Sequence, residues 1–183
     1  MKILKKILII AFVLQITEGV NAQTWANISS TRGSFNFQLP GNNFISKDTL
    51  GVLFYNYQVD TALTLDTHYI DDAVMIQNDA LFTSLLNQNS GDSLRAVSGM
   101  MLLLTNGQLV SIQNLVATSS YPKGIEIGFT YKSDMSADGL IFSRIFYTNN
   151  KFTSFSINGA ASDAVRIGLY KTTFFNSISF SQP

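Results

Sequence analysis

The stretch from Gly124 to Phe180 constrains the fold more than any other part of the sequence. Runs rich in β-branched and aromatic residues follow one another here, separated by a polar loop at 133–138 and by Asn149-Asn150. Such runs are typical of strands, and adjacent asparagines suit a two-residue type I′ turn, which needs a positive φ twice. The stretch therefore predicts two consecutive β-hairpins, followed by a closing helix over about 162–175.

The first hairpin allows a prediction of register, because its loop centres near Met135. The numbers of paired residues should then sum to about 270, which places Glu126 directly opposite Arg144. Counting from the asparagine turn places Arg144 opposite Phe155 in the second hairpin. We expect a partly buried structural ion pair between Glu126 and Arg144, with the guanidinium against the Phe155 ring. The alternative is that Arg144 faces a cleft and holds an anionic ligand.

Both faces of these hairpins carry large apolar side chains. A sheet with one solvent-facing side would alternate more cleanly between apolar and polar residues, so helices are expected against the sheet. Further strands are predicted over 34–39, 52–59, 62–70 and 109–117. The expected fold class is α+β: a mostly antiparallel sheet of about seven strands, flanked by helices as in an α/β/α sandwich.

The region between residues 71 and 105 has a helical pattern. Ser90-Gly91-Asp92 interrupts it and can cap a second helix, in which one face is shared by Leu94, Val97, Met101 and Leu104. The run from Met100 to Leu104 also fits a buried strand, and caps at both ends favour the helix. The closing helix over 162–175 has two apolar stripes, so we expect it to be buried on two sides.

Several of these features occur together in a known family. They are Glu126, Arg144, Asn149-Asn150 and Phe174-Phe175, preceded by an opening strand that starts at Gly33 and ends in Pro40-Gly41. In this order they resemble the PsbP-like superfamily of small secreted or lumenal α/β domains. The resemblance covers residues 33–180, although the usual proline after the third strand is missing and 87–90 is polar. It implies a non-catalytic domain that assists or stabilises a larger complex through its surface.

Residues 1–22 have the pattern of a signal peptide. Lys2, Lys5 and Lys6 precede an apolar run over 7–16, and Val20-Asn21-Ala22 places small residues where signal peptidase cleaves. The run is shorter than the ~20 residues of a membrane-spanning helix, and no cysteine is present to carry a lipid. We expect a free chain that starts at Gln23, with 23–183 as a single globular domain in the periplasm or outside the cell.

The charge of the expected mature chain argues against one class of partner. Removing Lys2, Lys5, Lys6 and Glu18 from the 12 cations and 12 acids leaves nine cations and 11 acids, a net charge of −2. Nucleic-acid binders carry clustered basic residues, whereas these cations are scattered singly, so no nucleic-acid partner is expected. Without cysteine, disulfides and thiolate metal sites are excluded as well.

The single histidine, His68, follows Asp66 by two residues and so shares a strand face with it. A zinc site needs three or four protein ligands, and no calcium-binding loop motif is present. We therefore expect no metal and no cofactor, with His68 on an edge strand beside solvated aspartates. A hydrolase with His68 as its base is a distant alternative, since no G-x-S-x-G motif occurs.

The function that the sequence favours is that of an exported, non-enzymatic accessory or protein-binding domain. Its partner would be another protein or a component of the cell envelope. The alternative is a carrier that holds an apolar small molecule between sheet and helices, where Met75, Met100 and Met101 would make the interior adaptable. Candidates for an aromatic binding surface, or for the core, are Tyr55, Tyr57, Tyr69, Tyr121, Tyr131 and Tyr147.

Overall fold

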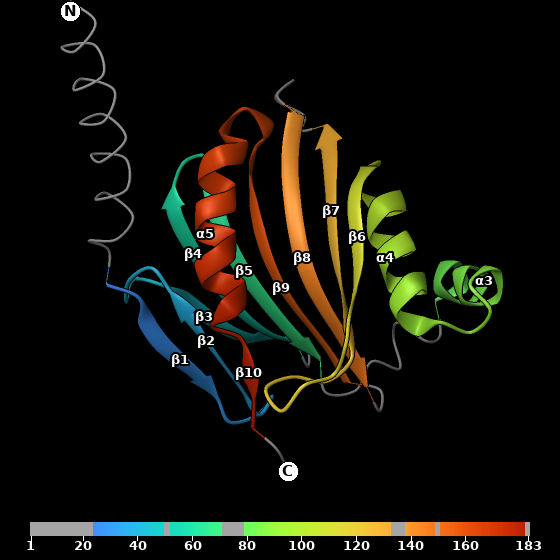
Figure 1. Cartoon of the computed structure of the whole chain (residues 1–183), viewed down its shortest axis with the longest axis horizontal. Coiled ribbons are helices and arrows are strands. Elements are labelled where there is room, and N and C mark those ends of the chain that lie inside the picture. Colours follow the sequence, from blue (N-terminus) through green and yellow to red (C-terminus); the bar gives the residue numbers. More distant parts are fainter. Residues whose placement is uncertain (1–23, 50–51, 71–78, 133–137, 149–150, 182–183) are drawn as a thin grey trace, which may run out of the picture.

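The computed structural model describes residues 24–49, 52–70, 79–132, 138–148 and 151–181 (Figure 1). The segment 1–22, assigned above as a signal peptide, lies outside these ranges. Seven strands form a larger sheet in which all neighbours are antiparallel. In spatial order they are β3 (Ile45–Thr49), β4 (Val52–Asp60), β5 (Leu63–Ile70), β9 (Lys151–Ala160), β8 (Asp138–Thr148), β7 (Gly124–Lys132) and β6 (Gln108–Leu115). The predicted α+β class is confirmed.

The registers of both hairpins agree with the prediction. Glu126 lies opposite Arg144 in the β7–β8 pair, and Ile125 lies opposite Ile145. Arg144 lies opposite Phe155 in the β8–β9 pair. The register could be counted because alternation and loop length are both local properties of the chain. The asparagine turn itself lies outside the described residues.

A second, three-stranded sheet was not expected. It has the order β1-β2-β10, with β1 at Ala26–Ser30, β2 at Phe35–Leu39 and β10 at Ser179–Phe180. The strand predicted over 34–39 is therefore present but belongs to this smaller sheet. A two-residue strand such as β10 leaves no alternation that could be recognised in a sequence. β10 forms by pairing with β2, at the other end of the chain.

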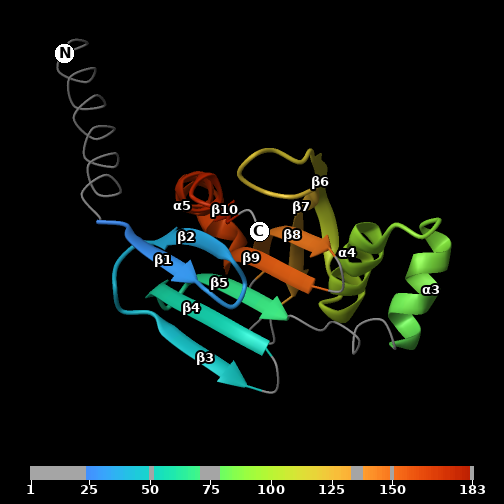
Figure 2. The same ribbon diagram turned by 90° about the horizontal axis from the view of Figure 1, so that it is seen from below.

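The helices lie on both faces of the larger sheet. α5 (Ala164–Asn176), which follows a 3-10 turn at Ala161–Asp163, lies on one face together with the smaller sheet. α4 (Ser93–Leu104) packs against β7 and β8 on the opposite face, and α3 (Ala80–Gln88) packs on α4 (Figures 1 and 2). We refer to these as the α5 face and the α4 face. Within the described ranges, no helix combines the length and apolarity needed to cross a membrane.

Two aspartates set the starts of α3 and α4. Asp79 accepts hydrogen bonds from the first turn of α3, and Asp92 accepts one at 3.0 Å from the N–H of Leu94. Side-chain caps of this kind contribute about 0.5–2 kcal/mol each. α4 continues to Leu104, so the run from Met100 is helical as predicted, and Asn106 beyond it adopts a φ of 48°.

The core on the α5 face is mainly aromatic. Phe35, Phe37, Phe155 and Phe174 are at most 1% exposed. Phe155 meets Phe35 and Phe37 edge-on, with ring centroids 5.4 and 5.6 Å apart. Burying each ring contributes about 1.5–3 kcal/mol, and each edge-to-face pair about 0.5–1.5 kcal/mol more. These rings fill the space between the sheet and α5.

The core on the α4 face is mainly aliphatic. Ile125, Ile127 and Ile145 project from the sheet toward Ala96 and Val97 of α4. All five residues are buried. The two cores account for the large apolar side chains that both faces of the hairpins carry, and they confirm the expectation of helices against the sheet.

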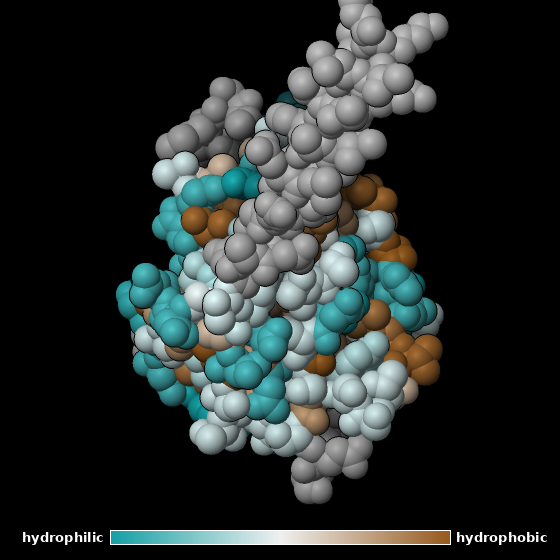
Figure 3. All heavy atoms as spheres, turned by 60° about the vertical axis from the view of Figure 1, so that its left-hand side comes forward, coloured by the Kyte–Doolittle hydropathy of each residue, from teal (hydrophilic) through white to brown (hydrophobic). Residues whose placement is uncertain are grey.

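One expectation about α5 is wrong. Ile167, Tyr170 and Phe174 are buried, but Val165 is 80% exposed and Leu169 also faces solvent. The second apolar stripe is therefore on the surface, because no further layer covers α5 in the described part of the chain. Elsewhere, residues of hydrophilic or intermediate hydropathy cover most of the side of the molecule drawn in Figure 3.

Candidate functional site

His68 and Asp66 lie on the α4 face of β5, an interior strand between β4 and β9. The expected edge-strand histidine beside solvated aspartates is therefore wrong. Burial raises the pKa of Asp66. The hydrogen bond that Asn56 Nδ2 donates to Asp66 Oδ1, at 2.5 Å, acts to lower this pKa but is the smaller effect. Burial also lowers the pKa of His68, whose ring lies 4.9 Å from that of Phe54. Across the described ranges, no three His, Cys, Asp or Glu side chains are grouped to hold a metal ion.

Glu126 of β7 accepts hydrogen bonds from two cations on the α5 face. Arg144 Nε donates to Oε2 at 2.9 Å, and Lys171 Nζ of α5 donates to Oε1 at 2.7 Å. Arg144 Nη1 also donates to the carbonyl oxygen of Phe175 at 2.7 Å. Burial acts to raise the pKa of Glu126, but the hydrogen bonds from Lys171 and Arg144 outweigh it and lower that pKa. These contacts connect the β7–β8 hairpin to α5.

The prediction that the Arg144 guanidinium lies against the Phe155 ring was wrong. The guanidinium lies over Phe175, 4.9 Å from the ring centroid, and not against Phe155. Phe155 does lie across from Arg144 in the sheet, but its ring packs among Phe35 and Phe37 in the aromatic core. Arg144 is covered by α5 and lies outside the pocket described next. Its structural role remains a prediction.

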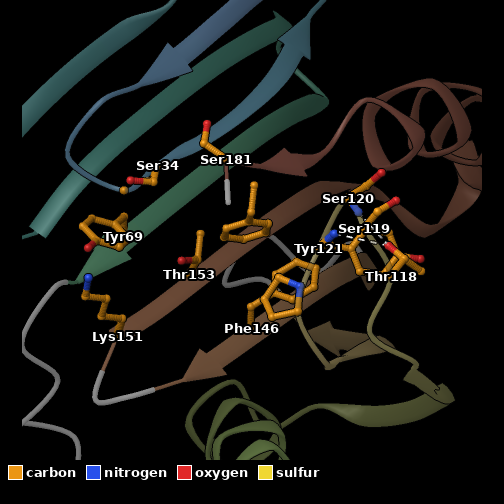
Figure 4. A pocket seen from close by; sticks show the side chains of 13 residues that line it. Ser34, Tyr69, Thr118, Ser119, Ser120, Tyr121, Phe146, Lys151, Thr153 and Ser181 are labelled. Atoms are coloured by element: carbon orange, nitrogen blue, oxygen red, sulfur yellow. Dashed lines mark hydrogen bonds between the residues drawn. The ribbon is translucent and has the colours of Figure 1, made fainter. Parts of the chain in front are cut away.

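A pocket of about 390 Å³ opens on the α5 face, beside β10 and the first residues of β9 (Figure 4). Its floor is a row of side chains across three strands. Tyr69 of β5 lies opposite Thr153 of β9, which in turn lies opposite Phe146 of β8. We call it the serine-rimmed pocket, since its rim contains Ser34, Ser119, Ser120 and Ser181.

The walls of the serine-rimmed pocket come from the β1–β2 turn, from β10 and from the loop after β6. Backbone hydrogen bonds join them: the N–H of Ser181 donates to Ser34 O at 2.7 Å, and the N–H of Phe180 donates to Ser120 O at 2.6 Å. Thr118 Oγ1 accepts from the N–H of Ser120 at 3.1 Å, which fixes the loop locally. The rim is thus preorganised by contacts between distant parts of the chain.

The lining combines aromatic rings, hydroxyl groups and one cation. The Phe146 ring lies 5.8 Å from Tyr121 and 5.0 Å from Phe180. Lys151 stands near Tyr69 at one end, and the serines of the loop stand at the other (Figure 4). None of the lining residues is acidic. This arrangement suits a ligand with an apolar ring system, hydrogen-bonding groups and an anionic group.

Two residues of this pocket were candidates from the sequence. Tyr69 and Tyr121 were among the tyrosines proposed for a binding surface or the core, and both line the pocket. Tyr55 from the same set is buried in the core. The serines were missed because a serine-rich loop gives no sequence signal of what it faces. Only the position of β10 reveals that they share a rim.

Comparison with known proteins supports the fold assignment. No protein-family model matches the chain, and no curated protein matches it in sequence. In structure the chain is similar to CyanoP, the cyanobacterial PsbP of Synechocystis, with a TM-score of 0.50 and 12% identity, over 86% of this chain and 93% of that one. The chain has a PsbP-like fold. The resemblance inferred from the sequence is therefore confirmed at the level of the fold.

Other solved structures with weaker similarity include LpqN of Mycobacterium tuberculosis, a protein involved in cell envelope biogenesis. It has a TM-score of 0.41 and 10% identity, over 91% of this chain and 97% of LpqN. A Pseudomonas aeruginosa protein of unknown function has a TM-score of 0.42 and 8% identity, over 78% and 87%. A PsbP-like fold alone does not define an activity, because one fold hosts many functions.

Proposed function

We propose that this chain is an exported, non-enzymatic accessory domain that binds a small amphiphilic molecule in the serine-rimmed pocket. The observation that carries the proposal is the pocket itself. Its volume of about 390 Å³ lies within the ~300–1,000 Å³ that is usual for small-molecule sites. Its rim is held by hydrogen bonds within the protein, so little ordering remains to be done on binding.

The ligand class follows from the lining. The half-buried rings of Tyr121 and Phe180, above the buried floor of Tyr69 and Phe146, favour an apolar ring system that packs offset or edge-on against them. Lys151 at one end favours an anionic group, and it meets no competing acid in the lining. The serine hydroxyls can donate or accept, so they suit a ligand that carries further oxygens.

The proposed site differs from the carrier position suggested by the sequence. That position was between the sheet and the helices, where Phe37, Phe155 and Phe174 now fill the space on the α5 face. The serine-rimmed pocket instead lies beyond the end of α5, next to β10. A ligand there would contact the smaller sheet and the loop after β6 rather than the helices.

The position of His68 supports a binding function over hydrolysis. A serine nucleophile needs a base within hydrogen-bond reach. Tyr69 points to the α5 face and lines the pocket, so its neighbour His68 points to the opposite face. The pocket serines and the chain's single histidine are thus separated by the sheet.

The test is a fluorescence titration with 1-anilinonaphthalene-8-sulfonate, a probe that joins aromatic rings to a sulfonate. Ser119→Trp should fill the mouth of the pocket and raise the probe's Kd at least tenfold. Lys151→Gln should raise it by a factor of about 1.4–5, the loss of one exposed charge contact of ~0.2–1 kcal/mol. The control is Ser84→Trp, an exposed serine on α3, which should leave the Kd unchanged.

Native mass spectrometry of the protein, purified mildly from the exporting cell, is the companion measurement. We expect an added small-molecule mass that Ser119→Trp removes and Ser84→Trp retains. Probe binding that is unaffected by Ser119→Trp would place the binding site elsewhere. A clean apo mass together with no saturable probe binding would overturn the proposal.

A further inference from the structure

The outer strand β6 forms one edge of the larger sheet, and large apolar side chains in and beside it are exposed to solvent. Leu103 and Leu104 at the end of α4, with Leu109 and Val110 of β6, are between 52% and 69% exposed. Val116, directly after β6, is 79% exposed. β6 pairs with β7 on one side, and within the described strands nothing pairs with its other side. An exposed apolar edge with free backbone groups is a template for pairing with another strand.

The other edge of the same sheet is protected. β3 carries Lys47 and Asp48, and Asp48 accepts a hydrogen bond from Arg32 of the β1–β2 turn. Charged residues are a common means by which edge strands avoid pairing with other chains. β6 contains no charged residue of its own; Arg95 of α4 reaches it on the α4 face, where Nη2 donates to Asn114 Oδ1 at 3.0 Å.

We propose that β6 pairs antiparallel with β6 of a second copy, so that two sheets join across a two-fold axis. The charge pattern favours a second copy as the occupant. Two-fold antiparallel pairing brings every charge of a strand toward the copy of that charge in the other strand, which is destabilising near the axis, and β6 contains no charged residue. The expected mature chain also has a net charge of only −2, so long-range repulsion between copies is small.

The regular part of β6 sets the register of the dimer. A bulge interrupts the β6–β7 ladder between Leu109 and Ser111, and the pairing is regular from Ser111 to Leu115. The centre of this segment is Gln113, so a two-fold axis at Gln113 lets every residue of the segment pair with the second copy. Val110, at the bulge, and Val116, directly after β6, flank the two ends of this segment, so the same axis brings Val110 of each copy near Val116 of the other. Exposed apolar side chains at both ends of the segment are thereby covered.

The first test is sedimentation velocity of the purified protein over a range of concentrations, with matched lysine variants. We expect a monomer–dimer equilibrium with a Kd roughly in the micromolar range, since a strand-to-strand interface is small. Val110→Lys should weaken the dimer at least tenfold, because two-fold symmetry introduces the lysine twice. Ile45→Lys, at a similarly exposed apolar residue of the β3 edge, should leave it unchanged. A monomer at all concentrations would overturn the proposal.

The second test uses the absence of native cysteine. Gln113→Cys should oxidise rapidly to a disulfide-linked dimer, because residues at the two-fold axis face their own copies at about 4.5–5.5 Å between Cα atoms. Ser111→Cys should not cross-link to itself, since its partner in this register is Leu115. Both residues are exposed and lie on the same strand. Equal cross-linking at both positions, or dimer loss in Ile45→Lys, would rule out the β6 interface.

Discussion

The contacts around Glu126 allow a quantitative prediction for Arg144→Met. The substitution leaves the Phe175 carbonyl oxygen without its donor, which costs about 1–3 kcal/mol for a buried group. It also removes the guanidinium from the Phe175 ring, a contact of about 0.5–1 kcal/mol. Glu126 keeps Lys171, so the ~3–5 kcal/mol cost of an isolated buried charge does not apply in full. We expect a net loss of about 2–3 kcal/mol, or roughly 4–12 °C in Tm.

Glu126→Gln should lower the free energy of unfolding by more, toward ~3–5 kcal/mol, because two cations then lose their shared negative charge and the amide keeps an acceptor oxygen for only one of them. The double variant should lose less than the sum of the two single losses, by about 1 kcal/mol or more. Urea unfolding followed by the fluorescence of Trp25, the single tryptophan, measures these values. Arg166→Met is the control: it pairs with Asp60 and Asp163, the three side chains are 36–40% exposed, and about 0.2–1 kcal/mol is expected for each pair.

The coupling between Glu126 and Arg144 should also depend on pH. The pKa of Glu126 is lowered in the folded protein from its ordinary value of 4.5. The stability that the ionised Glu126 carboxylate contributes is therefore fully present above pH 4.5 and is lost as the pH falls through the folded pKa. If Arg144→Met leaves stability unchanged or raises it, the structural pair is refuted, and Arg144 belongs to a ligand site instead.

Three further predictions concern other parts of the chain. Asp66→Asn should raise Tm at pH 7 but not at pH 3, as thermal melts at both pH values will show. Burial raises the pKa of Asp66 above its ordinary 3.8, so the stability that the protonated carboxyl group contributes is fully present below pH 3.8 and is lost as the pH rises through the folded pKa. His68→Ala should leave probe binding within twofold of the unsubstituted protein; stoichiometric zinc binding that the substitution abolishes would contradict us. N-terminal analysis of exported protein should begin at Gln23, whereas an intact Met1 in membranes would exclude cleavage.

The sequence predicted the features that depend on local pattern. The register of Glu126 opposite Arg144 followed from alternation and one loop, and the start of α4 followed from the cap at Asp92. Lys171 was missed as the third member of the charge network. Its contact with Glu126 depends on how α5 is rotated against the sheet, and neither alternation nor capping determines that rotation.

The serine-rimmed pocket could not be predicted for a related reason. Its floor needs the order of β5, β9 and β8 in the sheet, and its walls need β10 beside β2. Hydrophobic pattern gives the faces of a strand but not its neighbours. The sequence therefore gives no sign that Ser34 and Ser181 are more than loop residues, although a backbone hydrogen bond joins them in the pocket wall.

The pairing of β10 with β2 has a consequence for how the chain folds. Phe35 lies opposite Phe180, so these two strands must close a loop that contains nearly the whole domain. Such a closure is slow and becomes favourable only once the intervening sheet exists, which places the pairing of β10 with β2 among the last steps of folding. If the chain crosses a membrane from its N-terminal end, β2 emerges early and can pair with β1, while its other edge waits for β10. The seven-stranded sheet can assemble during that interval, and the pocket becomes complete only when the final residues arrive.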